Sequence, residues 1–336
     1  MSYFEGRTIL VTGGTGSFGQ HFIRTALAKW NPAAIRIFSR DELKQTQMER
    51  AFDDERLRFF IGDVRDRDRL RRAIGGADVV IHAAALKHVP VCEYNPFEAI
   101  KTNILGTQNV AEACIDAHVP RAVALSTDKA VSPANLYGAT KLCAEKLFVQ
   151  SNVYAGADDT RLSCVRYGNV VGSRGSVIPL FRDQAGSGEL SVTDQRMTRF
   201  WITLDQAVQL VADCVEHMLG GEVFVPKIPS TRVLDLAEVI APGLPIRYTG
   251  IRPGEKLHES LITPEEARHT KDLGWCYVVE PEHAFWGTRG TSHGTSVAED
   301  FVYSSDRNTQ WLEVAELRDL MASWPAGTIM ATSEEG

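Results

Sequence analysis

The chain has 336 residues, 44% of them hydrophobic and 24% charged, a balance typical of a soluble globular protein and not of a disordered or fibrous chain. Its formal net charge of −7 comes without a basic block, so nucleic acid is not expected as a partner. Six widely spaced cysteines and nine histidines show neither disulfide nor metal-ligand spacing, so we expect no metal site. No signal peptide and no apolar run of membrane-span length is visible, which favours a cytoplasmic protein without a membrane partner.

The first predicted unit is a strand, a glycine turn and a helix. Residues 8–12 are an apolar, β-branched run, and an apolar helical pattern continues to residue 27 after the glycines. Glycines in this context let the backbone approach a pyrophosphate, which lies at the helix amino terminus. Their Gly-x-x-Gly-x-x-Gly spacing differs from the Gly-x-Gly-x-x-Gly of classical dehydrogenases. We assign to cofactor binding Gly13, Thr15, Gly16, Ser17, Phe18 and Gly19.

The second predicted strand, residues 34–38, ends in residues that distinguish NADP from NAD. An NAD enzyme usually has an acid here, which binds the ribose hydroxyls. Ser39 and Arg40 hold that place with Lys44 close behind, a set suited to a 2′-phosphate. The sequence therefore favours NADP. In the alternative interpretation Arg40 is solvated, Asp41 binds the ribose and the cofactor is NAD.

Two further strands are predicted at residues 58–61 and 79–81. The first is followed by Asp63 and Val64, which we assign to the adenine, and then by a charged stretch typical of a solvated helix face.

The strand at 79–81 is followed by small residues, which allow a cofactor to lie close, and then by Lys87. We assign Lys87 to both cofactor and substrate, and we predict a long helix over residues 96–118. The small residues assigned to the cofactor are Ala83, Ala84 and Ala85.

The next predicted strand, residues 122–125, carries polar residues at its carboxyl end, where ligands bind in open parallel sheets. These residues are Ser126, Thr127, Asp128 and Lys129. A helix beginning near Tyr137 places Lys141 one turn further along the same face. An ammonium near a phenol stabilises the phenolate, so the pair suits a tyrosine that acts as a base.

The second half of the chain is predicted to form a smaller lobe over the carboxyl edge of the sheet. We divide the chain into a cofactor domain (1–165, with later segments returning to it), a substrate lobe (166–324) and a disordered tail (325–336). Residues 287–296 have the composition of a flexible loop. Arginine matches phosphate oxygens with paired hydrogen bonds, and the candidates for holding a diphosphate are Arg174, Arg199 and Arg252.

Together these motifs resemble the extended short-chain dehydrogenase/reductase superfamily and, within it, the sugar-nucleotide 4,6-dehydratases that invert carbon 5. The resemblance covers residues 6–260 and returns at 303–312. It includes the glycine turn, the Tyr/Lys pair and the stretches SRDELK (39–44), FFIGDVRD (59–66), HAAALKHVP (82–90), STDKA (126–130), RYGNVVGSRGSV (166–177), RMTRFWIT (196–203), FVPKIPS (224–230) and IRPGEKLHE (251–259). It implies an α/β, Rossmann-type doubly wound parallel sheet with a smaller carboxyl-terminal substrate-binding lobe.

The resemblance also implies roles for the residues. Tyr137 would take the proton of the sugar 4-hydroxyl, Lys141 would lower the tyrosine pKa and bind the nicotinamide ribose, and Val170 would contact the cofactor. Asp128 would protonate the departing 6-hydroxyl and Lys129 would remove the carbon 5 proton, with Thr127 beside them. Burial should favour the neutral forms of Asp128 and Lys129, whereas their opposite charges should oppose that. The implied substrate is UDP-N-acetylglucosamine, and its expected ligands are Lys87, Ser126, Thr127, Asn169, Arg174, Val177, Arg199, Arg252 and Glu255.

Three other functions remain open. A dehydratase that retains carbon 5 resembles this chain, but its long membrane-anchored forms carry methionine at the position of Tyr137. A UDP-sugar 4-epimerase would not need the Asp-Lys pair after Thr127. A non-catalytic NADP-binding regulator would be expected to have lost the catalytic positions, which are all present. The resemblance further implies a homo-oligomer, such as a hexamer, and a step in pseudaminic acid synthesis for flagellin glycosylation.

Overall fold

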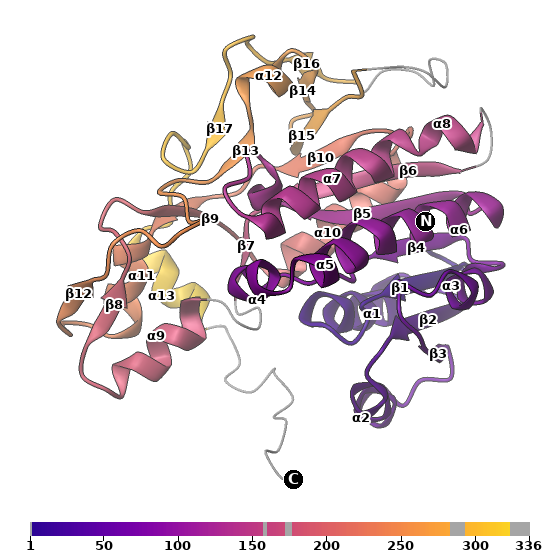
Figure 1. Ribbon diagram of the computed structural model, residues 1–336, viewed down its shortest axis with the longest axis horizontal. Helices are drawn as coiled ribbons and strands as arrows, with labels where there is room; N and C mark the ends of the chain where they lie inside the picture. The colour runs from indigo at the N-terminus through magenta and orange to yellow at the C-terminus, as the bar shows by residue number, and fades with distance from the viewer. Residues whose placement is uncertain (1, 157–159, 172–176, 283–292, 323–336) are drawn as a thin grey trace.

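The computed structural model describes residues 2–156, 160–171, 177–282 and 293–322. Its centre is a ten-stranded sheet in the order β16-β14-β15-β10-β6-β5-β4-β1-β2-β3 (Figure 1). The parallel strands, in sheet order, are β3 (Leu57–Ile61), β2 (Ala34–Ser39), β1 (Thr8–Thr12), β4 (Val79–His82), β5 (Arg121–Thr127), β6 (Arg161–Tyr167) and β10 (Val223–Pro226). Antiparallel strands extend this sheet beyond β10: β15 (Cys276–Val279), β14 (Thr270–Asp272) and β16 (Thr295–Ser296).

Helices cover both faces of the parallel strands. On one face α7 (Leu136–Gln150) packs beside α6 (Gly106–Asp116), which contacts α3 (Arg67–Ile74). On the other face α10 (Leu204–His217) packs against α1 (Ser17–Lys29). Because both faces are covered, the central strands read as apolar runs, and β4 is buried along its whole length. The strand order from β3 to β6 is that of a Rossmann fold, so the predicted α/β doubly wound sheet is confirmed.

The predicted long helix over residues 96–118 is a nearly continuous rod with a wider middle turn. It consists of α5 (Pro96–Ala99), a π-helical turn (Ile100–Leu105) and α6, which ends at Asp116. Asn103 in the π-helical turn is buried, and its side chain bonds both the N–H and the carbonyl of Leu86, at 2.8 and 2.9 Å. Single π turns often occur at functional sites, and here the turn fixes the loop that follows β4.

A second hydrophobic core lies beside the sheet, on the left in Figure 1. Strand β9 (Thr198–Ile202) joins the two cores, because consecutive side chains of a strand point to opposite faces: Phe200 belongs to the main core and Trp201 to the second. The second core is built from β8 (Leu190–Val192), β9, β12 (Ile246–Tyr248), α9 (Val177–Ala185), α11 (Val233–Ile240) and α13 (Val314–Ala322). Strand β9 also pairs with β7 (Asn169–Val170) and β11 (Ser230–Arg232) in a three-stranded sheet.

Shorter elements complete the described chain. They are α2 (Glu42–Phe52), α4 (Val89–Tyr94), the 3₁₀ turn η2 (Asp128–Ala130), α8 (Asn152–Ala155), α12 (Pro264–Ala267), β13 (Ser260–Ile262) and β17 (Tyr303–Ser304). No helix in the described ranges is long and apolar enough to cross a membrane.

One sequence prediction is wrong in part. The flexible loop expected over 287–296 ends in strand β16, whose Thr295 and Ser296 pair with β14. The content of small polar residues predicted a loop. Main-chain hydrogen bonds to the neighbouring strand hold Thr295 and Ser296 at the sheet edge, and composition does not reveal such bonds. Residues 287–292 of that loop and the tail predicted over 325–336 lie outside the described residues. The proposed division of the chain at residue 165 stays a prediction.

Candidate active site

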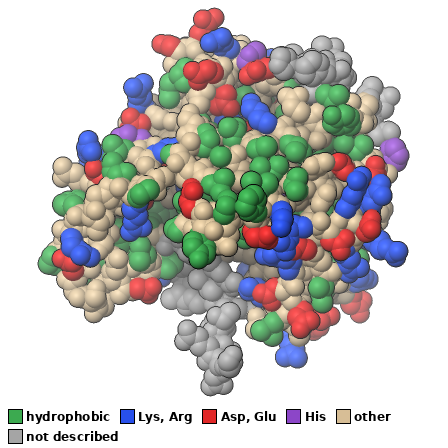
Figure 2. Space-filling model, viewed as in Figure 1, with side chains coloured by type: hydrophobic (Ala, Val, Ile, Leu, Met, Phe, Trp, Pro, Cys, Tyr) green, Lys and Arg blue, Asp and Glu red, His purple; other side chains and the backbone are tan. Residues whose placement is uncertain are grey.

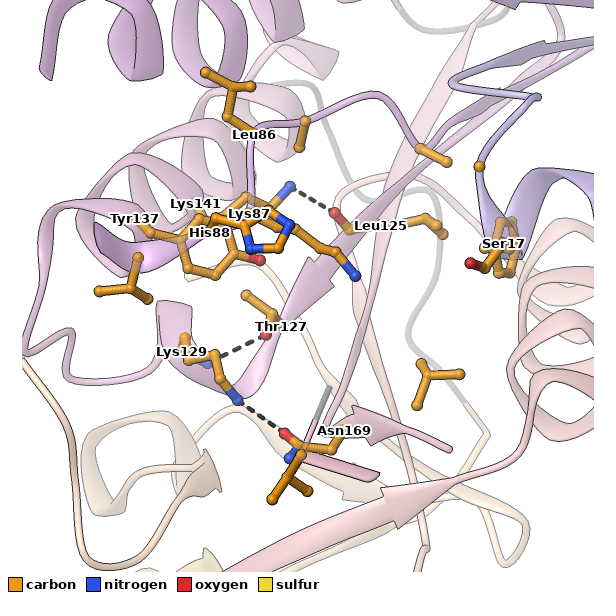
Figure 3. Close-up of a pocket in the computed structure, with 18 of the residues that line it drawn as sticks. Ser17, Leu86, Lys87, His88, Leu125, Thr127, Lys129, Tyr137, Lys141 and Asn169 are labelled. Carbon is orange, nitrogen blue, oxygen red and sulfur yellow. Dashed lines mark hydrogen bonds between the residues drawn. The ribbon is translucent and has the colours of Figure 1, made fainter. Parts of the chain in front are cut away.

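A cavity of about 1470 Å³ opens at the carboxyl ends of β1, β2, β4, β5 and β6 and extends to the second core. This is where open α/β sheets bind ligands. Every predicted site residue in the described ranges lines it except Asp128, which lies behind the wall. Arg174 lies outside the described residues. Figure 3 shows the part of the cavity around Thr127, Lys129 and Tyr137.

The glycine turn between β1 and α1 leaves room for a pyrophosphate. Gly13 has a positive φ of 68°, and a Cβ there would lie 2.8 Å from the backbone nitrogen of Ala84. The turn therefore packs directly on the loop after β4, which only glycine permits. Helix α1 begins at Ser17 and has no side-chain cap, so its first N–H groups face the cavity side of the turn without a capping partner. These features fit a dinucleotide cofactor.

The end of β2 carries the residues expected to bind the adenosine ribose or its 2′-phosphate. The Ser39 hydroxyl lies 2.9 Å from that of Thr15. Arg40 is more than half exposed and its Nη1 lies 3.7 Å from Asp63, whereas Lys44 pairs with Asp41 at 2.6 Å. Asp41 also caps α2, and its bonds to Lys44 lower the pKa of its carboxyl group. Arg40 and Asp41 both line the cavity, but Asp41 also has partners within its own helix.

The polar cluster after β5 forms because the strand passes directly into the 3₁₀ turn η2. The Lys129 ammonium donates to Asp128 Oδ1 and to Asn169 Oδ1, both at 2.9 Å. Figure 3 shows the bond to Asn169. The Thr127 hydroxyl also donates to Asp128 Oδ1 at 2.9 Å. Asp128 is fully buried, so it reaches the cavity only through Thr127 and Lys129.

Burial and charge act differently on the two members of this pair. Burial raises the pKa of Asp128, and the nearby Glu259 carboxylate adds to this against the opposing ammonium of Lys129. For Lys129, burial lowers the pKa, but the carboxylates of Asp128 and Glu259 outweigh it and the pKa is raised. The sequence left open whether burial or the neighbouring charges determine the pKa of Lys129. In the structure the neighbouring carboxylates determine it, and burial alone does not leave Lys129 neutral.

Tyr137 and Lys141 lie one turn apart on α7, as predicted, and both face the cavity. Burial raises the pKa of Tyr137 to about 12, while the Lys129 charge and a hydrogen bond with the Thr127 hydroxyl lower it. The Lys141 ammonium donates to the Leu125 carbonyl at 2.7 Å, and burial lowers its pKa. The Lys129 charge acts on the Tyr137 phenol in this structure, and the role expected for Lys141 stays a prediction.

Helix α7 is fixed by contacts at its start and in its middle. At the start, the Asn135 side chain accepts the Gly138 N–H at 2.8 Å and donates to the Gly254 carbonyl at 2.8 Å. In the middle, Glu145 is buried against Arg166 at 2.6 Å, and Arg166 continues to Glu266 at 2.7 Å. This buried ion pair joins α7 to β6 and α12, so the position of Tyr137 depends on both halves of the chain.

The substrate side of the cavity is lined by Val177, Arg199, Arg252 and Glu255. Arg199 is buried, and its guanidinium donates to the backbone carbonyls of Thr198, Leu257 and Lys256. Arg252 is exposed at the cavity rim and lies at the start of the same loop. Arg252 is thus available to an anionic ligand, and Arg199 holds the loop that carries it.

Some functional residues were missed from the sequence. Asn103, Gly138 and Glu259 contact the site, but only the fold brings them there. Glu259 ends the stretch IRPGEKLHE, in which the prediction singled out Arg252 and Glu255. Its position at the end of that motif was the one available signal. No group of three or more His, Cys, Asp or Glu side chains within the described ranges could hold a metal ion.

Comparison with known proteins finds relatives that match nearly the whole chain. The sequence matches the family model described as "Polysaccharide biosynthesis protein" over residues 9–281. It is 50% identical over 95% of its length to the UDP-N-acetylglucosamine 4,6-dehydratase (inverting) of Campylobacter jejuni subsp. jejuni serotype O:23/36 (strain 81-176), and covers 98% of that protein. It is 40% identical over 95% of its length to the UDP-glucose 4-epimerase of Rickettsia canadensis (strain McKiel), and covers 96% of that protein.

A solved structure shows a similar fold. The crystal structure of DesIV, a dTDP-glucose 4,6-dehydratase from Streptomyces venezuelae with NAD and TYD bound, superimposes with a TM-score of 0.68 at 25% identity. The match covers 83% of this chain and 93% of that one.

Proposed function

Because this chain belongs to the polysaccharide biosynthesis protein family, we propose that it is a UDP-N-acetylglucosamine 4,6-dehydratase that inverts carbon 5. The product would be UDP-2-acetamido-2,6-dideoxy-β-L-arabino-hex-4-ulose, an intermediate of pseudaminic acid synthesis for flagellin glycosylation. The observation that carries the proposal is the Asp128–Lys129 hydrogen bond at 2.9 Å beside Tyr137, at the wall of a cavity of about 1470 Å³, which is large enough for a cofactor and a nucleotide sugar.

A bound nicotinamide cofactor would accept a hydride from carbon 4 of the sugar and return it to carbon 6, so it is regenerated in each turnover. The glycine turn and the uncapped start of α1 would hold its pyrophosphate. Ser39, Arg40 and Lys44 support NADP over NAD, because a serine and two cations suit a 2′-phosphate.

Tyr137 would take the proton of the 4-hydroxyl. Its phenol is buried, hydrogen-bonded by Thr127 and near the Lys129 charge, so a phenolate forms at less cost than burial alone would impose. Lys141 would bind the nicotinamide ribose from the next turn of α7 and hold the Leu125 carbonyl.

The Asp128–Lys129 pair would carry out the elimination. Transfer of one proton across the 2.9 Å hydrogen bond turns the ammonium and carboxylate into an amine and a carboxylic acid, the two forms that the reaction needs. The amine of Lys129 then removes the carbon 5 proton, which the new 4-ketone has acidified. Once Asp128 holds the proton, the Thr127 hydroxyl, which donates to Asp128 Oδ1 in the structure, would turn to accept that proton and pass its own to the departing 6-hydroxyl in the cavity.

Incubation with UDP-N-acetylglucosamine in deuterated water tests the proposal. We expect NMR to show a 4-keto-6-deoxy sugar with deuterium at carbon 5 and inverted configuration there. The same product with unchanged configuration would identify a retaining dehydratase. A 4-epimer without deuterium would identify an epimerase, the function named for the Rickettsia relative.

The proposal includes a homo-oligomer, such as a hexamer. Hydrophobic side chains are exposed along α4, α5 and the π-helical turn, where Tyr94 is 86% and Phe97 74% exposed. Figure 2 shows hydrophobic side chains gathered on this face of the molecule. Burial of such a patch between subunits stabilises an assembly.

A further inference from the structure

Glu259 is a nearly buried carboxylate directly before β13, and cations surround it. Its Oε1 lies 3.7 Å from Lys129 Nζ and 3.9 Å from Arg199 Nε, and its Oε2 lies 3.4 Å from Lys256 Nζ. Buried carboxylates are costly unless they are paired, so its position needs an explanation.

The hydrogen bonds of its neighbours do not supply that explanation. Arg199 donates to three backbone carbonyls, and Lys256 donates to the Val131 carbonyl at 2.7 Å. Lys129 already bonds Asp128 and Asn169. What Glu259 adds to these groups is negative charge, placed within 4 Å of the Lys129 ammonium.

We propose that Glu259 is a positioning residue that sets the pH range in which the Asp128–Lys129 pair holds the single proton required for elimination. The inference rests on the proposed function. The charged and titratable groups that face the pair are Asp128 itself on η2, Tyr137 on α7, Arg199 on β9, and Lys256 and Glu259 on the loop before β13; Asn169 on β7 is neutral.

The direction in which Glu259 shifts the acid limb of the pH profile depends on the number of protons that the Asp128–Lys129 pair holds. The reactive pair holds one proton, on Asp128, and leaves Lys129 as an amine. As the pH falls, a second proton makes the pair cationic and inactive. The negative charge of Glu259 stabilises that cationic state, since it raises the pKa of both Asp128 and Lys129. The cations around Glu259 outweigh its burial and lower its own pKa, so it is ionised in the working range.

The test is the acid limb of the pH profile for carbon 5 deuteration and dehydration of UDP-N-acetylglucosamine by the holoenzyme. Glu259→Gln should move this limb to lower pH by about 1 unit, because a neutral amide no longer favours the second proton. Glu259→Asp keeps the charge and should leave the limb near its wild-type position. Tyr137, whose pKa burial raises to about 12, titrates far above the pH range of this limb.

Two further variants make the outcome decisive. Glu265→Gln removes an exposed carboxylate on α12 and should leave the limb unchanged. Lys256→Met removes a cation on the far side of Glu259 and should move the limb to higher pH, which tests the inference even if Glu259→Gln does not fold. A wild-type limb position in a folded Glu259→Gln enzyme, or in Lys256→Met, overturns the inference. If the wild-type enzyme puts no deuterium on carbon 5, the proposed function itself fails.

Discussion

Gly138, the second residue after the start of helix α7, packs directly on the backbone carbonyl of Lys129. A Cβ at this position would lie 2.2 Å from that oxygen and 3.0 Å from Pro133 Cβ. The missing side chain is what allows the helix that carries Tyr137 to lie against the turn that carries Lys129. The spacing between the two elements that carry the proposed catalytic residues is therefore set by a glycine.

We predict that Gly138→Ala separates these elements. The added methyl group must displace the backbone of η2 or α7, and we expect a loss of about 1–3 kcal/mol in the free energy of unfolding. Turnover should fall at least about tenfold, because sub-ångström misplacement of catalytic groups is costly. Urea unfolding and turnover are to be compared with Gly186→Ala, whose new Cβ would meet its nearest atom at 3.5 Å. Wild-type stability and turnover in Gly138→Ala would show that η2 and α7 can accommodate a methyl group between them, which would contradict this prediction.

A second prediction concerns the cofactor. Arg40→Asp should weaken binding of NADP far more than binding of NAD, because the new carboxylate repels a 2′-phosphate and tolerates ribose hydroxyls. Fluorescence titration with both cofactors measures the ratio. Arg50→Asp, a similar charge change on the exposed side of α2, is the control and should alter neither affinity strongly. Equal losses for both cofactors in Arg40→Asp would favour Asp41 as the ribose ligand and NAD as the cofactor.

A third prediction concerns Tyr137. Tyr137→Phe removes one hydroxyl from a buried ring, so the fold should remain while turnover falls by about two to four orders of magnitude. Circular dichroism and thermal unfolding provide the folding control. Turnover within a few fold of wild type would remove Tyr137 from the mechanism.

A fourth prediction concerns stability and pH. His82 is buried between the hydroxyls of Thr12 and Thr107, and burial lowers its pKa to about 3. In the unfolded chain a histidine binds its proton near pH 6.5. Between these two pH values the unfolded state binds more protons than the folded state. The contribution of His82 to the free energy of unfolding is therefore fully present above about pH 6.5 and decreases as the pH is lowered toward 3.

His82 alone should therefore cost about 2 kcal/mol of unfolding free energy between pH 7 and pH 5. Urea unfolding at the two pH values should show this loss in the wild type and a smaller one in His82→Gln. An identical pH dependence in both proteins would mean that the folded chain accommodates a protonated His82.

The sequence predicted those features that depend on local pattern and on the order of elements along the chain. Strand β1 was placed at its observed bounds because a buried parallel strand reads as an apolar run. The polar residues after β5 and the Tyr137/Lys141 pair were assigned to one site because parallel strands end at one edge of the sheet. In each case the signal lies within a few residues.

The features that the sequence did not predict depend on contacts between distant segments. Glu259 meets Lys129 across 130 positions of the chain, and no spacing rule connects them. The proton balance of Lys129 was also not predictable, because it depends on burial and on two carboxylates at distances that only the fold sets. The sequence likewise placed Asp128 on the cavity wall, whereas the turn of η2 places it behind Thr127 and Lys129.

The central claim is that Lys129 is the base at carbon 5 and Asp128 the proton store beside it. It is tested most directly by deuterium exchange at carbon 5 of UDP-N-acetylglucosamine in Lys129→Met and Asp128→Asn. In Lys129→Met we expect oxidation at carbon 4 to proceed more slowly, because the Lys129 charge no longer lowers the pKa of Tyr137. The reduced cofactor should still accumulate, and no deuterium should enter carbon 5. In Asp128→Asn we expect slow elimination with exchange retained, because Lys129 remains and has lost the carboxylate that does most to raise its pKa. Exchange at the wild-type rate in Lys129→Met would contradict the account, since another residue would then be the base.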